Sequence, residues 1–131
     1  MKTFHIHCPP YNATIYFCIT EKKCEARHYF IENFNVDVGD KPDSILGYCL
    51  RSDIFGPAIW LPKMPETPFD FGTLTHELYH AVNNILNSKG VTDLNEPLAY
   101  LLGYVVESFY TMYPPINKPT FSILGKKIWI K

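Results

Sequence analysis

The segment FGTLTHELYHAVNN, residues 71–84, places two histidines four positions apart, with a glutamate directly after the first. In an α-helix each residue turns the chain by about 100°, so His76 and His80 leave the same face and their rings can converge on one atom. The segment is therefore expected to fold as an amphipathic helix, with an apolar back in the core and imidazoles turned away from it. Four apolar side chains form that back: Leu74, Leu78, Val82 and Ile85.

The pattern H-E-x-x-H is typical of a zinc site. Its chance occurrence in a chain with so few histidines and glutamates has odds of about one in a hundred. An ordinary helix with surface histidines would leave Glu77 without a role. Neutral imidazoles are good zinc ligands, and a carboxylate one position on can reach metal-bound water without ligating the metal. The pattern therefore predicts Zn²⁺ on His76 and His80.

A catalytic zinc site normally has three protein ligands and a water, so a third ligand must come from elsewhere. Glu96 lies sixteen positions after His80, in the first turn of the next predicted helix. A helix–loop–helix turn can bring it back opposite the histidines. Asp93 is the competing ligand, although an aspartate in this position is more typical of a turn or a helix cap.

The motif HELYH followed by NEPLAY resembles the gluzincin branch of zinc metallopeptidases. The match covers about residues 60–110, and the layout is similar to that of small predicted metallopeptidases encoded by tailed phages and prophages. The resemblance implies zinc on His76, His80 and Glu96, with Glu77 as general base. It also implies a minimal zincin-like α+β fold, in which a small mixed sheet packs on the HExxH helix and a second, C-terminal helix. The edge strand of that sheet, expected at residues 58–61, would pair with an extended substrate.

The chain departs from the larger members of this family in two places. Fifteen residues separate His80 from Glu96, which leaves room only for a tight connection. Thermolysin-like members have an aspartate four residues after the ligand glutamate, where this chain has Tyr100. The metzincin alternative requires a glycine and a histidine where the chain has Asn83 and Leu86, so that family is excluded.

Further polar side chains share faces with these residues. Glu96, Tyr100, Gly103 and Glu107 lie on one face of the second helix. Tyr100 is the catalytic candidate, as a donor to an oxyanion; Tyr104 is the alternative, and core packing is the other role open to both. Glu107 could orient a histidine.

Other polar side chains have no assigned role. Asn83 and Asn87 extend the histidine face of the first helix. His5 and His7 share one side of a predicted strand, but without a third ligand nearby they are expected to be ordinary side chains.

Length and composition predict one domain. With 131 residues, 47% of them hydrophobic, the chain can form one core, placed at residues 13–112 with a tail at 113–131. A formal charge of −1 gives no field that would favour nucleic acid or an anionic membrane. No signal peptide or transmembrane run is recognisable, so the expected location is the cytoplasm of a bacterium or a phage-infected host cell, with the four cysteines as thiols.

The remaining elements follow from hydrophobic patterns and turn residues. Strands at residues 3–7 and 13–19 flank CPPYN and predict a hairpin, and residues 45–50 and 58–61 predict two more strands. Three helices are expected: at 21–34, capped by Thr20; from a cap at Asp70 or Thr73 to Gly90; and at 96–112. The tail is expected either to add a strand or to wrap the domain.

The predicted function is therefore a zinc metallopeptidase that hydrolyses a peptide or protein substrate, with Glu77 as general base. Two alternatives stay open: a binding or host-interaction protein clamped by zinc without catalysis, and a zinc hydrolase of a non-peptide amide. The choice between endopeptidase and exopeptidase, and the oligomeric state, are left open as well.

Overall fold

The N-terminal hairpin forms as predicted. The structure is a computed structural model that describes residues 1–42, 44–52, 55–93, 95–114, 120–123 and 126–129, the last two ranges by their backbone. Strands β1 (Lys2–Cys8) and β2 (Ala13–Ile19) pair antiparallel along their whole length. A 3₁₀ turn at Pro9–Tyr11 and Asn12 with φ 45° connect them, because asparagine tolerates this left-handed conformation.

The sheet has the order β1-β2-β4-β3, which corrects the prediction for residues 58–61. β4 (Ala58–Leu61) pairs parallel with β2 and antiparallel with β3 (Tyr48–Leu50), so β4 is an internal strand and β3 is an edge. All four residues of β4 are buried. A continuous apolar run such as AIWL is typical of a strand that is covered on both faces.

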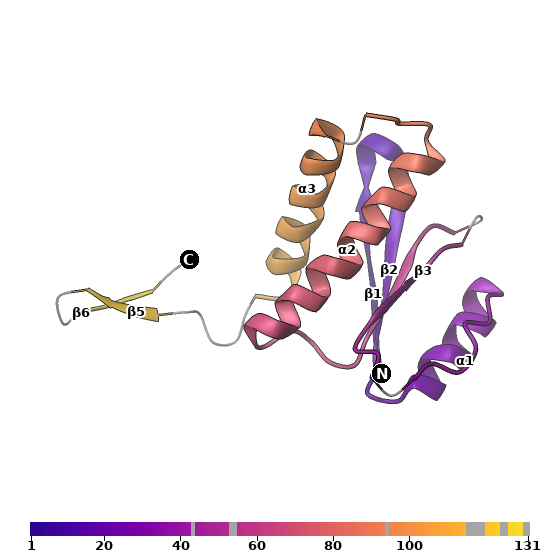
Figure 1. Cartoon of the computed structure of the whole chain (residues 1–131), viewed down its shortest axis with the longest axis horizontal. Helices are drawn as coiled ribbons and strands as arrows, with labels where there is room; N and C mark the ends of the chain where they lie inside the picture. The colour runs from indigo at the N-terminus through magenta and orange to yellow at the C-terminus, as the bar shows by residue number, and fades with distance from the viewer. Residues whose placement is uncertain (43, 53–54, 94, 115–119, 124–125, 130–131) are drawn as a thin grey trace.

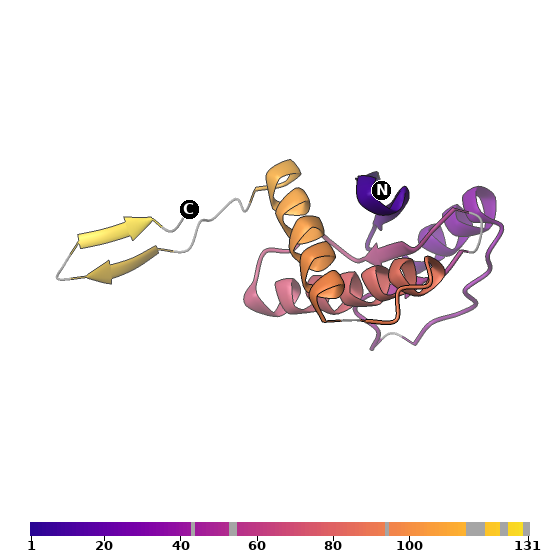
Figure 2. The same ribbon diagram turned by 90° about the horizontal axis from the view of Figure 1, so that it is seen from above.

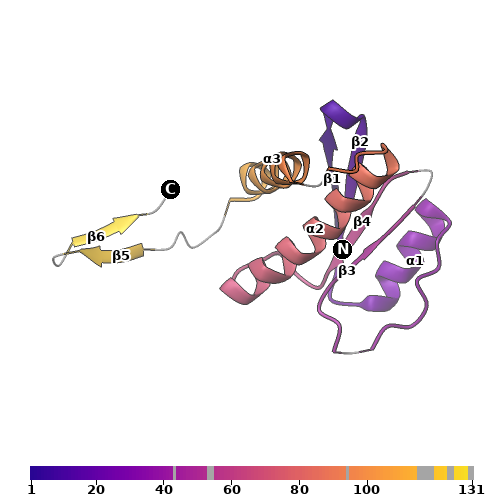
Figure 3. The ribbon, with the colours of Figure 1, turned by 45° about the horizontal axis from the view of Figure 1, so that its top comes forward.

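Helices cover both faces of this sheet (Figures 1 and 3). On one face, α1 (Lys23–Phe34) buries Ala26, Phe30 and Phe34 against Trp60, as its apolar spacing predicts. The helix begins two residues later than expected and Thr20 is not its cap. Instead, the Thr20 hydroxyl donates to the Glu25 carboxylate at 2.9 Å.

The other face of the sheet is covered by α2 (Pro68–Ser88) and α3 (Glu96–Met112), which lie side by side (Figures 1 and 2). The apolar back predicted for the HExxH helix is buried. α3 has the predicted bounds, with Pro97 in the first turn, where no amide donor is needed. Its buried residues are Leu101, Val105 and Phe109.

The start of α2 differs from the prediction. Thr67 is the N-cap, and its side chain accepts from the Asp70 amide while the Asp70 carboxylate accepts from the Thr67 amide at 3.1 Å. Asp70 is thus the third residue of a capping box, and Thr73 lies inside the helix. Pro68 at the first helical position fits this assignment, because proline is favoured there. The helix ends before Gly90, whose φ is 74°.

The tail forms its own small sheet, in which β5 (Thr120–Ile123) pairs antiparallel with β6 (Lys126–Trp129). Neither strand joins the four-stranded sheet. Residues 115–119, which belong to the same predicted tail, lie outside the described part of the chain. No helix among the described residues is long and apolar enough to cross a membrane.

Candidate metal centre

The two histidine rings of α2 converge, as their spacing predicts. The Nε2 atoms of His76 and His80 lie 3.2 Å apart, at hydrogen-bonding distance. Two ligands of a tetrahedral ion, each about 2.0–2.1 Å from the metal, are separated by about 3.3 Å. Both rings are exposed, so they present this pair of nitrogens to the outside of the helix. The pair therefore fits two corners of a zinc tetrahedron.

The third residue of the motif, Glu77, differs from the two histidines in its burial. Its residue is only 6% exposed, although both histidines beside it are exposed. The Glu77 Oε1 atom is 3.9 Å from His76 Nε2. Burial raises the pKa of the Glu77 carboxyl, and the two histidines lower it.

Cys49, on the edge strand β3, packs on the face of the sheet that α2 covers. Burial, and secondarily the Glu77 charge, raise the pKa of the Cys49 thiol to about 12. Cys49 was not predicted to lie on this side of the sheet. Tyr48 and Leu50 pack on the α1 side of the sheet and Cys49 on the α2 side, so strand alternation was the available signal.

The third predicted ligand, Glu96, does not join the histidine pair. Its side chain is exposed at the first residue of α3 and lines a groove with Pro10, Tyr11 and Tyr100. Within the described ranges, no three His, Cys, Asp or Glu side chains are grouped closely enough to hold a metal ion. The structure thus brings together two of the three predicted ligands and the predicted base.

Asp93, the competing candidate for the third ligand, has the other role open to it, that of a turn residue. Its carboxylate accepts a hydrogen bond from the Asn95 amide at 3.1 Å, just before α3 begins. Such an Asx turn is a common way to enter a helix.

The tyrosines of α3 have different surroundings. Tyr100 is 77% exposed, in the groove that also holds Glu96. The Tyr104 hydroxyl donates to the backbone carbonyl of His7 at 3.3 Å and so attaches α3 to β1. This contact supports the packing role for Tyr104, whereas the catalytic role of Tyr100 stays a prediction.

The remaining polar candidates have surroundings of their own. The His5 ring lies tilted beside the Tyr16 ring, with centroids 6.0 Å apart, and the His7 ring is hydrogen-bonded to the Thr14 hydroxyl at 3.1 Å, so each imidazole has its own partner. Exposed Glu107 lines a shallow hollow with these two histidines. On α2, the half-buried Asn83 has a side-chain oxygen with no hydrogen-bond partner among the described residues, and Asn87 is exposed.

Comparisons with protein-family models, with curated proteins and with solved structures give no significant match. The resemblance to gluzincins therefore rests on the motif residues themselves. His76, Glu77 and His80 are the part of that motif that is assembled in the structure.

Proposed function

We propose that this chain is a zinc-dependent metallopeptidase in which His76 and His80 hold the zinc ion, with Glu96, which lies apart from them in this structure, as the third ligand. The observation that carries the proposal is the pair of Nε2 atoms 3.2 Å apart beside a buried carboxylate. The imidazole pair fits zinc in spacing and in chemistry. The Glu77 carboxylate lies near the pair, with Oε1 3.9 Å from His76 Nε2, and is not one of the proposed ligands. Glu96 is assigned as the third ligand by the motif.

Bound zinc would polarise the substrate carbonyl and acidify the attacking water. The protein's own contribution is made by Glu77, which accepts a proton from that water and returns it to the departing amine.

The substrate is expected to be an extended peptide. β3 is an edge strand with one unpaired side, and its Cys49 packs on the face of the sheet that is covered by α2, the helix that carries Glu77. A peptide that pairs with β3 would therefore pass the catalytic carboxylate with its backbone hydrogen bonds satisfied. This placement favours peptides over small non-peptide amides, which have no backbone to pair with a strand.

The test of this function is hydrolysis of an unfolded, fluorescently labelled casein by protein loaded with one equivalent of zinc. We expect cleavage that stops when a chelator removes the metal and resumes when zinc is restored. A chain that binds zinc tightly but cleaves neither casein nor any member of a peptide library would instead be a zinc-clamped binding protein.

A further inference from the structure

A buried amide oxygen without a partner lies close to the histidine pair along α2, on Asn83. Its Oδ1 atom is one of two buried side-chain polar atoms that have no hydrogen-bond partner among the described residues. Buried polar atoms are nearly always hydrogen-bonded, so each exception calls for an explanation such as a bound water or ion. The other exception, the Tyr48 hydroxyl, belongs to the α1 side of the sheet. The partner of Asn83 is therefore to be sought on α2.

Asn83 belongs to the face of α2 from which the imidazoles project. At about 100° per residue, it lies about 60° from His80 and about 20° from His76 around the helix axis. Side chains three residues apart on a helix are neighbours, with about 5–6 Å between their Cβ atoms. Helical side chains also lean toward the N-terminus of their helix, so the Asn83 amide leans toward the turn that carries His80. The amide oxygen is thus within reach of the His80 ring.

An imidazole that binds a metal through Nε2 needs a second partner at Nδ1. The contacts between these side chains run through Nε2, which is 3.2 Å from the other ring and, in His76, 3.9 Å from Glu77 Oε1. A neutral ring with a free Nε2 lone pair carries its proton on Nδ1. Histidines that bind a metal almost always donate this proton to an oxygen, which fixes both the tautomer and the orientation of the ring. The buried oxygen of Asn83 is an acceptor of the required kind.

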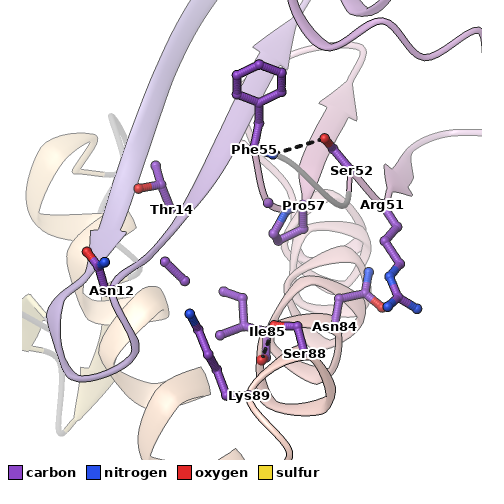
Figure 4. Close-up of a pocket in the computed structure, with 12 residues that line it drawn as sticks. Asn12, Thr14, Arg51, Ser52, Phe55, Pro57, Asn84, Ile85, Ser88 and Lys89 are labelled. Carbon is purple, nitrogen blue, oxygen red and sulfur yellow. Dashed lines mark hydrogen bonds between the residues drawn. The ribbon is translucent and has the colours of Figure 1, made fainter.

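Asn84 is the competing acceptor, because it follows His80 by four residues. It lies about 40° from His80 around the helix, on the side opposite to Asn83. Its side chain lies beside that of Arg51, in a pocket at the C-terminal part of α2 (Figure 4). Asn84 is therefore in polar surroundings of its own, whereas the buried oxygen of Asn83 has no partner.

We propose that Asn83 is a positioning residue of the metal centre, whose amide oxygen accepts a hydrogen bond from Nδ1 of His80. This inference rests on the proposed zinc site and adds a supporting residue to it. The bond would hold His80 as the tautomer whose Nε2 lone pair faces the ion. Without the bond, the oxygen stays buried and unsatisfied, which lowers the stability of the protein.

The test measures the zinc affinity of the full-length protein by competition with a fluorescent zinc chelator. Asn83→Leu, which has no acceptor but a similar size, is expected to bind zinc about 10–100-fold more weakly, as is usual when such a partner is lost. Asn83→Ala should show the same loss with less bulk. Asn83→Asp keeps an acceptor and is expected to bind zinc at least as tightly as the parent.

Thermal unfolding of the metal-free proteins separates this role from a purely structural one. Asn83→Leu removes a buried oxygen that has no partner, so its Tm is expected to be no lower than that of the parent. A structural role would give the reverse result, a lower Tm with unchanged zinc affinity. That result would overturn the inference.

Two further variants and the parent complete the comparison. Asn87→Leu is the matched control, because Asn87 is an exposed asparagine seven residues after His80, and its zinc affinity should equal that of the parent. A larger loss of affinity in Asn84→Leu than in Asn83→Leu would overturn the inference in favour of Asn84. Equal affinities in the parent and Asn83→Leu would overturn the inference alone. A parent that binds no zinc would overturn the proposed function, and this inference with it.

Discussion

Replacing Glu77 by glutamine is expected to lower the turnover of peptide hydrolysis by about 10²–10⁴-fold while leaving zinc bound. The amide has nearly the same shape as the carboxyl, so it fits the same buried position. It cannot accept a proton from water or return one to an amine. The two imidazoles that converge beside it are not altered.

The measurement is kcat on a peptide substrate, together with zinc content by mass spectrometry of the metal. Glu32→Gln is a matched control, because Glu32 is an exposed glutamate of α1 and its loss removes only a surface pair with His28. A Glu77→Gln protein that cleaves the substrate as fast as the parent would show that Glu77 is not the general base.

Replacing Glu96 by glutamine is expected to lower zinc affinity by about 10–100-fold or more. Loss of a residue that only positions a metal ligand already lowers affinity by about 10–100-fold, and Glu96 is proposed as a ligand itself. A neutral amide is a much weaker ligand than a carboxylate for this ion. Glu107→Gln is the matched control, since Glu107 is exposed on the same face of α3, eleven residues further on. Competition with a fluorescent zinc chelator measures both variants.

Each outcome of this comparison has a defined meaning. Equal affinities in the parent, Glu96→Gln and Glu107→Gln proteins would remove Glu96 from the zinc site. If the Asp93→Asn protein then lost the metal, the third ligand would be Asp93, whose carboxylate in the structure accepts a hydrogen bond from the Asn95 amide.

Most of the fold could be predicted from the sequence because its elements carry strong local signals. The bounds of α3 and the antiparallel hairpin were predicted, since apolar spacing and turn residues agree there. The prediction that β4 is an edge strand was wrong, because strand order depends on pairings between distant segments that no local pattern specifies. The start of α2 was placed too late because proline-rich residues before it concealed the Thr67 capping box.

The candidate site was predictable only as far as one helix reaches. The spacing of His76 and His80 determines that their rings meet, because it depends on helix geometry alone. The position of Glu96 relative to them depends on the path of the α2–α3 connection, which spacing does not determine. The packing of Cys49 on the α2 side of the sheet depends on the sheet order and was likewise out of reach.

The most direct test is the zinc content of the purified full-length protein, measured beside a His80→Ala variant after dialysis against trace zinc. The parent is expected to retain one zinc per chain, and the variant, with one imidazole of the pair removed, is expected to retain almost none. A parent protein without zinc, or a variant that keeps a full equivalent, would contradict the assignment of this histidine pair as a metal centre.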